Sequence, residues 1–318
     1  MMFLRYITVI LLLTTTLILP GKELKVLMIG NSFSRSVYSY LPQLVNEEKT
    51  HKLVLTSAYI GDCALQQHYE NIVKAEKDPD FKPYKMSVWK SQENPAGTRK
   101  STDFSGNVNE LLKSNQYDII TIQQRSVASV DHATYEPYTT EIIKYIRKHQ
   151  KNAEIVIQQT WSYHAQSRSF ARWKISQKDM YTRLRNAYKT SSEKHNLRVI
   201  PMGDAVEFFR ENTPKKYKSP DSGKVYKEPE LPSFAGEVVG YPEWRSGRKD
   251  GKLYRYIHFD YVHLNDHGEY MQAVCWYSFL FNENAEKVAF VPESIKAEDA
   301  AFLKKCAAEA IRNYNQVK

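Results

Sequence analysis

Five short apolar runs, rich in β-branched residues, alternate along the chain with segments of helical character. The runs cover residues 24–29, 53–58, 118–122, 154–158 and 197–202, and the helical segments cover 36–45, 108–113, 139–148 and 176–195. Strands that are buried on both faces read as continuous apolar runs, and parallel neighbours need crossover connections between them. The alternation predicts an α/β fold with a five-stranded parallel sheet between two layers of helices.

The C-terminal part of the chain continues this pattern. Tyr270, Val274, Tyr277 and Phe281 fall on one helical face, and a last helix is expected over 298–313. The chain has 318 residues, of which 42% are hydrophobic, so it can bury one sizeable core. We expect a single main domain over residues 21–318.

Two polar stretches interrupt the alternation. Residues 75–106 and 213–257 are rich in proline, and the second carries ten Lys or Arg against six Asp or Glu. Loops this long inside a compact domain are usually functional or disordered. We interpret both as insertions over the edge of the sheet where a ligand would bind. The second is expected to contact substrate because it leads directly into residues 258–263.

Residues 1–20 resemble an export leader. Arg5 is followed by an apolar stretch over residues 7–19, which is long enough for the core of a signal peptide and short for a membrane span. Residues 19–21 make a poor cleavage site, so an uncleaved N-terminal anchor stays open. No later stretch is apolar enough to cross a bilayer. The sequence thus predicts a periplasmic or secreted bacterial protein.

The cysteines and the charge narrow the class of protein only slightly. Cys63, Cys275 and Cys306 are too few and too scattered for a disulfide framework or a zinc knuckle, although an oxidising compartment would allow one pair. The net charge of +9 suits either a polyanionic partner or simply a solvated basic surface. Because no zinc-finger spacing, RNA-binding motif or compact basic helix is present, no nucleic-acid partner is expected.

The end of the first apolar run carries a possible nucleophile. Gly30 and Asn31 can form a tight turn there, and Ser32 would open the helix that follows. The free N–H groups and the dipole at a helix N-terminus favour a developing negative charge. Ser32 could therefore attack a substrate and help to bind an oxyanion, although a serine at this position is also an ordinary helix cap.

An Asp-x-x-His pattern near the other end of the chain supplies possible partners for Ser32. On a turn, the carboxylate of Asp260 can reach Nδ1 of His263 and leave Nε2 directed at Ser32. Such a pair alone is common on protein surfaces. Together with the serine turn at the end of the first strand, it predicts a serine hydrolase with the triad Ser32, His263 and Asp260, which requires no cofactor.

With these motifs the sequence resembles the SGNH, or GDSL-like, hydrolase family, and in particular a bacterial branch described as a domain of unknown function. The resemblance extends over most of residues 24–283 and implies a flavodoxin-like three-layer sandwich. It assigns the nucleophile to Ser32 and the other triad members to Asp260 and His263. A glycine after the second strand gives an oxyanion N–H in this family, and Gly61 occupies that place.

The third family motif is different in this chain. The family has Gly-x-Asn-Asp after the third strand, with the Asn completing the oxyanion hole, whereas this chain has Gln123 and Gln124. A Gln amide can donate the same hydrogen bond from a longer side chain, so Gln124 is the candidate third donor beside Ser32 and Gly61. The alternative is that both glutamines only tie strand ends together.

Side chains just after the third and fourth strands could contact a substrate, because ligands of open parallel sheets bind beyond the carboxyl ends of the strands. Arg125 could meet a carboxylate, and Trp161 and Tyr163 could stack on a sugar, unless these aromatic rings pack under a loop. A metal site among the histidines and aspartates of residues 258–267 is conceivable, but the His-Glu-x-x-His pattern is absent and no metal is expected.

The family includes carbohydrate esterases, lysophospholipases and thioesterases. Export and the polar, aromatic insertions favour an exported esterase that removes O-acetyl or similar small acyl groups from a carbohydrate, which could be acidic. A lipase would be expected to have an apolar lid. Two alternatives remain: a lipid or acyl-thioester hydrolase with the same triad, and a non-catalytic glycan-binding protein with the same fold.

Overall fold

A computed structural model describes residues 21–93, 102–221 and 223–316. The expected leader, residues 1–20, lies outside the described residues. Within them, no helix has the length and apolar character needed to cross a membrane. All three cysteines are buried and free of disulfides.

The main sheet has seven strands. In spatial order these are β4 (Thr102–Gly106), β3 (Tyr84–Lys90), β2 (Lys52–Tyr59), β1 (Glu23–Gly30), β5 (Ile119–Ile122), β6 (Glu154–Gln158) and β7 (Arg198–Ile200). The strands from β2 to β7 are parallel to one another, whereas β3 and β4 are antiparallel to their neighbours. The parallel part has the flavodoxin-like order, so the predicted α/β class is confirmed.

The predicted number of five strands is wrong, because two more lie within residues 75–106. Tyr84, Met86 and Trp89 in β3 are buried, so this segment packs in the sheet and is no loop insertion. β3 pairs with β2 along almost the whole length of β2, and this pairing sets the register of β3 in the sheet. Prolines flank β3 in the sequence, and for this reason the sequence pattern predicts a loop where this short strand lies.

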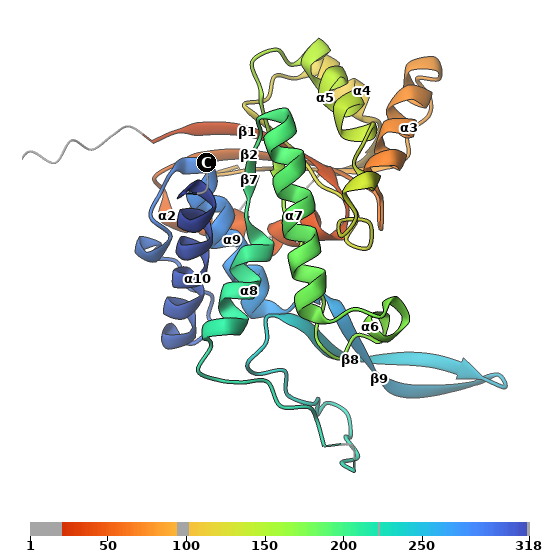
Figure 1. The fold of residues 1–318 in the computed structure, drawn as a ribbon, viewed down its shortest axis with the longest axis vertical. Coiled ribbons are helices and arrows are strands. Elements are labelled where there is room, and N and C mark those ends of the chain that lie inside the picture. The colour runs from red at the N-terminus through yellow and green to blue at the C-terminus, as the bar shows by residue number, and fades with distance from the viewer. Residues whose placement is uncertain (1–20, 94–101, 222, 317–318) are drawn as a thin grey trace, which may run out of the picture.

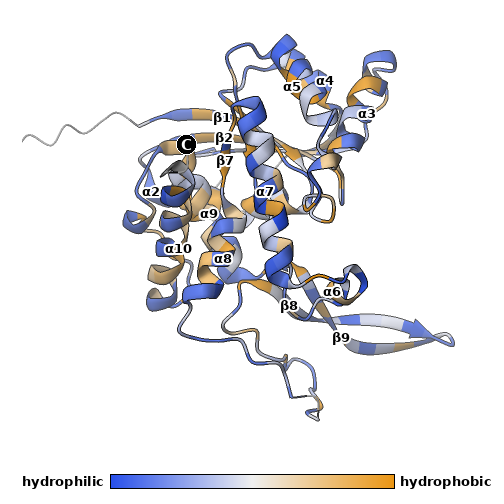
Figure 2. Ribbon diagram, viewed as in Figure 1, coloured by the Kyte–Doolittle hydropathy of each residue, from blue (hydrophilic) through white to orange (hydrophobic). Residues whose placement is uncertain are grey.

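Helices cover both faces of this sheet. They are α1 (Ser32–Arg35), α2 (Leu41–Glu48), α3 (Leu65–Lys77), α4 (Val108–Ser114), α5 (Tyr138–His149), α6 (Arg168–Trp173), α7 (Gln177–His195), α8 (Met202–Asn212), α9 (Asp266–Phe281) and α10 (Ala297–Gln316), with 3-10 turns η1 (Ser36–Ser39), η2 (His132–Thr134) and η3 (Ala285–Lys287). Figure 1 shows α3, α4 and α5 on one side of the sheet and α2, α9 and α10 on the other. Figure 2 shows apolar residues concentrated in the sheet and in α9, which is buried nearly all round, as a helix that is apolar on all sides must be.

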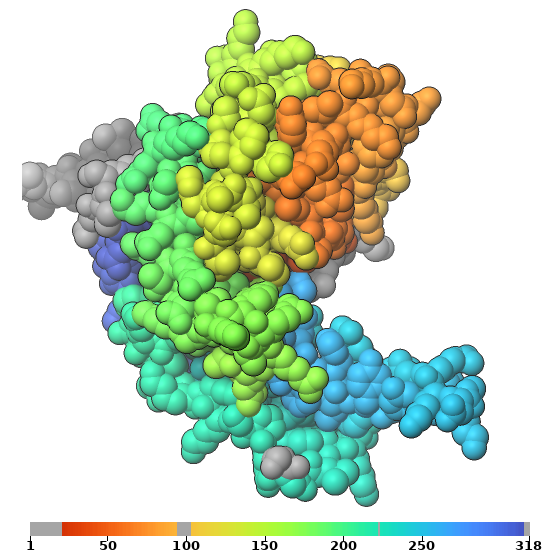
Figure 3. Space-filling model, turned by 45° about the vertical axis from the view of Figure 1, so that its right-hand side comes forward, coloured from red at the N-terminus to blue at the C-terminus, as the bar shows by residue number. Residues whose placement is uncertain are grey.

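A separate antiparallel hairpin follows the seven-stranded sheet. It consists of β8 (Val239–Lys249) and β9 (Lys252–Leu264), joined at Asp250 and Gly251, which both have positive φ angles. An Asp-Gly pair in this conformation forms the turn that matches the twist of two antiparallel strands. The second predicted insertion therefore ends in a strand pair that projects from the body of the molecule (Figures 1 and 3).

Candidate active site

Ser32 lies at the carboxyl end of β1, between the ends of β2 and β5. This is the point where the strand order of the parallel sheet reverses, at which open α/β sheets bind their ligands. Asn31 has an extended backbone and ends the strand, and α1 begins at Ser32. The Gly-Asn-Ser turn predicted from the sequence thus presents the Ser32 side chain at the sheet edge.

Buried amides hold this turn in place. Oδ1 of Asn31 accepts hydrogen bonds from the Phe33 N–H and from Nε2 of Gln123, and its Nδ2 donates to the Cys63 carbonyl, at 3.1 Å. The Phe33 carbonyl accepts from Nε2 of Gln158 and of Gln272, at 2.8 and 2.9 Å. The backbone on both sides of Ser32 is therefore fixed by side chains from β6, α9 and the end of β5.

Asp260 and His263 lie near the C-terminal end of β9, where the hairpin joins the body. Nε2 of His263 is 2.8 Å from Oγ of Ser32, and Nδ1 of His263 is 2.8 Å from Oδ2 of Asp260. The strand pair is irregular between Val239 and Tyr241. Gly240 has φ 95°, and an added Cβ would lie 2.8 Å from the Asp260 carbonyl, so only glycine fits this close approach.

The environment of Asp260 keeps its carboxylate ionised. Burial by itself raises the pKa of this carboxyl, but the hydrogen bond and charge of His263 and two backbone N–H groups outweigh burial and lower the pKa to about 2. Those N–H groups belong to Val262 and His263 and donate to Oδ1 at 2.8 and 2.9 Å. With one oxygen fixed by the backbone, the other is free to orient the imidazole.

Trp161 connects the segment that carries Ser32 with the segment that carries His263. Its Nε1 donates to the Val262 carbonyl at 2.9 Å, and its ring packs on Phe33 with centroids 4.2 Å apart. Trp161 is fully buried, and so is Tyr163, whose hydroxyl pairs with Ser126. Neither ring offers a surface on which a sugar could stack, which corrects the tentative substrate-binding role and favours the alternative of packing under a loop.

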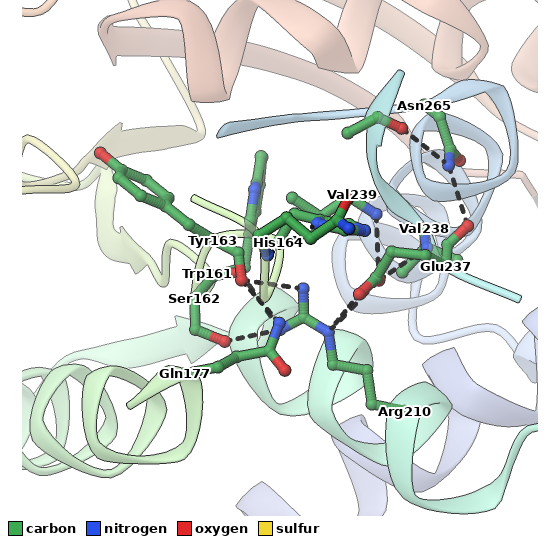
Figure 4. A network of polar contacts seen from close by, with 12 residues as sticks. Trp161, Ser162, Tyr163, His164, Gln177, Arg210, Glu237, Val238, Val239 and Asn265 are labelled. Atoms are coloured by element: carbon green, nitrogen blue, oxygen red, sulfur yellow. Dashed lines mark hydrogen bonds and ion pairs between the residues drawn. The ribbon is translucent and has the colours of Figure 1, made fainter. Parts of the chain in front are cut away.

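Figure 4 shows a second buried connection, centred on Arg210 of α8. Nε of Arg210 is 3.0 Å from Glu237, and Nη1 donates to Ser162. Oε1 of Glu237 accepts the N–H groups of Val238 and Val239, at 2.8 and 3.2 Å. The ion pair thus fastens the first residues of the β8–β9 hairpin to α8 and to the loop after β6.

Two of the predicted oxyanion donors, Gly61 and Gln124, differ in their exposure to solvent. Gly61 is exposed in the turn after β2, where Asp62 has φ 54° and forms an ion pair with Arg125. Gln124 is buried, and both hydrogens of its amide go to Thr134, at 2.9 and 3.1 Å. No amide hydrogen of Gln124 is left for an oxyanion, so its role is to tie the strand end to η2.

A pocket of about 330 Å³ opens beside Ser32 and His263. Its wall includes Arg35, Tyr38, Tyr241 and Glu269, and polar and apolar atoms contribute about equally to it. Burial and the nearby carboxylates raise the pKa of Tyr241 to about 12, so its hydroxyl stays protonated. In the described part of the chain no cluster of three metal-ligating side chains occurs; His267, for example, lies beside Asp299, and Asp266 bonds to Tyr40 and Ser294.

Comparison with known families identifies the chain. The family described as Domain of unknown function (DUF4886) matches residues 25–216, which is more than half of the sequence. The chain belongs to this family. The match confirms the sequence-based expectation of such a branch, and it includes Ser32 and Gly61 but ends before the hairpin that carries Asp260 and His263.

Solved structures support the fold of this DUF4886 chain. A DUF4886 family protein from Bacteroides uniformis has a TM-score of 0.71 and 24% identity, with 91% of this chain and 95% of that chain covered. A putative SGNH hydrolase from Slackia heliotrinireducens has a TM-score of 0.46 and 15% identity over 81% and 99%, and an acetyl xylan esterase 0.43 and 13% over 80% and 99%. The last two similarities are too distant to bear on activity. No curated protein matches the sequence.

Proposed function

We propose that this DUF4886 chain is a serine ester hydrolase of the SGNH type. The observation that carries the proposal is the continuous hydrogen-bond chain from Oγ of Ser32 through His263 to Asp260, with both distances at 2.8 Å. A base within hydrogen-bonding reach of a hydroxyl, itself oriented by a carboxylate, is the arrangement that activates a serine nucleophile.

In the first half of the reaction Ser32 Oγ attacks the ester carbonyl carbon while its proton moves to Nε2 of His263. The tetrahedral intermediate collapses when His263 returns that proton to the leaving alcohol, which leaves an acyl-serine. In the second half, water attacks the acyl-serine, His263 takes a proton from it, and the acid is released as Ser32 regains its hydrogen. Asp260 holds the correct tautomer and stabilises the imidazolium throughout.

The backbone N–H groups of Ser32 and Gly61 are the proposed oxyanion donors. At the start of α1, the Phe33 N–H is capped by the Asn31 side chain, and those of Ser34 and Arg35 bond to the Asn31 carbonyl. The first N–H groups of a helix have no partner inside the helix, so the Ser32 N–H is the one that remains for a ligand.

A small acyl ester on a carbohydrate is the proposed substrate. The pocket beside Ser32 is small and about half of its wall is polar, which suits an acetyl group on a hydroxylated carrier better than a long acyl chain. The segment before β8 is polar and provides no apolar lid. The apolar stretch at residues 7–19 supports the further proposal that the protein acts after export.

The test uses p-nitrophenyl esters of increasing chain length and the variant Ser32→Ala. We expect turnover of the acetyl ester to fall at least ~10³-fold in Ser32→Ala and to decline with chain length in the wild type. Ser105→Ala, at an exposed serine of β4, is the matched control and should turn over normally. Equal turnover by Ser32→Ala and wild type would refute the proposed mechanism, and a preference for long chains would refute the substrate.

A further inference from the structure

One face of the β8–β9 hairpin forms a surface that continues from the pocket beside Ser32. We propose that this face binds the chain of an acidic polysaccharide and leads it into the pocket. The inference rests on the proposed function and specifies its substrate class. The hairpin surface is defined by Tyr241, Arg245, Tyr254, Tyr256 and His258.

The pairing of the two strands puts these residues on the same face. Tyr254 pairs with Gly247, Tyr256 with Arg245, His258 with Glu243 and Asp260 with Tyr241. Residues opposite each other and residues two apart share a face of an antiparallel pair. Tyr241 also lines the pocket with Ser32 and His263, so the hairpin surface begins at the reacting groups and extends roughly 20 Å along β9.

The opposite face of the hairpin is already covered by the chain before β8. Nε1 of Trp244 donates to the Glu230 carbonyl, and Arg255 forms an ion pair with Glu228. Phe234 packs on the rings of Phe259 and Tyr261. The hairpin surface is therefore on the side away from this segment, and Figure 3 shows the molecule hollowed on that side, between the projecting hairpin and the body.

Two tyrosine rings lie exposed on the hairpin surface. Tyr254 is 48% exposed and Tyr256 38%, and their ring centroids are 5.6 Å apart. An added Cβ on Gly247 would lie 2.6 Å from the Tyr254 ring, so that ring lies flat against the opposite strand. Flat, amphipathic rings that lose little conformational entropy on binding suit the apolar faces of sugars.

The charge of the hairpin favours an anionic partner. Residues 243–256 carry five Lys or Arg against one Glu and one Asp, and two of the arginines, Arg245 and Arg255, form ion pairs with Glu243 and Glu228. At the tip, Lys249 and Lys252 lie on the hairpin surface and Arg248 on the opposite face, and none of the three forms an ion pair with any residue in the ranges that the structure describes. Long basic side chains at the tip can reach acidic groups along a polymer. The same charge opposes pairing with a second copy of this hairpin, because like charges would meet.

The experiment compares full-length wild type, Tyr254→Ala/Tyr256→Ala and Leu253→Ala. Leu253 is 68% exposed at the same tip and belongs to the opposite face, so it is a matched control. Binding is measured by affinity electrophoresis in gels that contain polygalacturonate or neutral glucomannan, which needs no catalysis. Hydrolysis is measured on acetylated polygalacturonate and on p-nitrophenyl acetate.

We expect the double variant to bind polygalacturonate about tenfold more weakly and to show a correspondingly higher KM on the acetylated polymer. Its turnover of p-nitrophenyl acetate, and both properties of Leu253→Ala, should stay at the wild-type level. The wild type should bind glucomannan more weakly than polygalacturonate, and added salt should weaken only the acidic interaction.

Equal binding of polygalacturonate by wild type and double variant overturns the inference. So does a change in sedimentation mass, or in binding to anionic phospholipid vesicles, that accompanies the double variant while polygalacturonate binding is unaffected. Absence of any Ser32-dependent ester hydrolysis refutes the proposed function instead, and the electrophoresis result then still decides whether the hairpin surface binds the polymer.

Discussion

The ion pair between Arg210 and Glu237 offers a sharp test of how the hairpin is held in place. The two side chains are 10% and 7% exposed, and Arg210 also donates to Ser162 and to the Tyr163 carbonyl. Arg210→Met keeps most of the side-chain volume and removes all these donors. Because it leaves the Glu237 carboxylate buried and without its cation, the free energy of unfolding should fall by about 3–5 kcal/mol.

The same change should reduce catalysis through geometry. Glu237 holds the N–H groups of Val238 and Val239, and Val239 pairs with Leu264, the residue after His263. A looser start of β8 should misplace the imidazole relative to Ser32, so kcat for p-nitrophenyl acetate should fall while KM changes little. Urea unfolding followed by tryptophan fluorescence gives the stability, and initial rates give the split between kcat and KM.

Two variants make the reasoning falsifiable. Arg255→Met breaks the ion pair between Arg255 of the hairpin and Glu228 of the segment before β8. Both partners are exposed, so the change should cost at most about 1 kcal/mol. Arg210→Met/Glu237→Gln removes the buried charge but keeps an oxygen for the N–H groups of Val238 and Val239, and should recover part of the lost stability. If Arg210→Met costs no more than Arg255→Met, the buried pair does not hold the hairpin.

Two further changes probe the site itself. Gln124→Leu leaves the N–H groups of Leu65 and Arg125 without their acceptor and should lower stability by about 1–3 kcal/mol in urea unfolding, yet reduce kcat less than about tenfold, whereas loss of an oxyanion donor costs ~10²–10³. A drop of the larger size would make Gln124 a donor after all. Asp260→Asn should lower kcat by ~10⁴. Since the folded pKa of Asp260 is about 2, below an unfolded value of about 3.9, its carboxylate stabilises the protein above about pH 4 and loses this effect as the pH falls through 2. The stability difference between wild type and Asp260→Asn should therefore shrink by roughly 2 kcal/mol between about pH 5 and about pH 2, and a constant difference would contradict the assigned pairing.

The parallel part of the fold could be predicted because its strands are buried on both faces. Each such strand is a continuous apolar run, and the five runs correspond to β1, β2, β5, β6 and β7. β4 is the edge strand and β3 lies between it and β2. In both strands polar residues alternate with apolar ones, and hydrogen bonding to the neighbouring strand defines the strand conformation. The β8–β9 hairpin was missed for the same reason, since many of its residues are partly exposed.

The candidate site likewise has some residues that the sequence could predict and others whose positions only the structure shows. Ser32, Asp260 and His263 could be named because local spacing brings a carboxylate to an imidazole and a turn presents a serine. The positions of Gln124, Trp161 and Tyr163 follow from partners far away in the sequence, such as Thr134 and Val262. Sequence position at a strand end shows that a side chain is near the ligand edge, but only packing decides whether it faces the ligand or the interior.

Buried polar side chains explain how two segments more than two hundred residues apart meet within hydrogen-bonding distance. An apolar core alone tolerates small shifts, because hydrophobic contacts are not directional. Here Gln158 and Gln272 fix the Phe33 carbonyl next to Ser32, and Trp161 bonds to the Val262 carbonyl next to His263 while its ring packs on Phe33. Each bond is lost if either segment slides, and an unpaired buried amide or carbonyl costs free energy. The directional bonds thus select the one packing in which Ser32 and His263 touch.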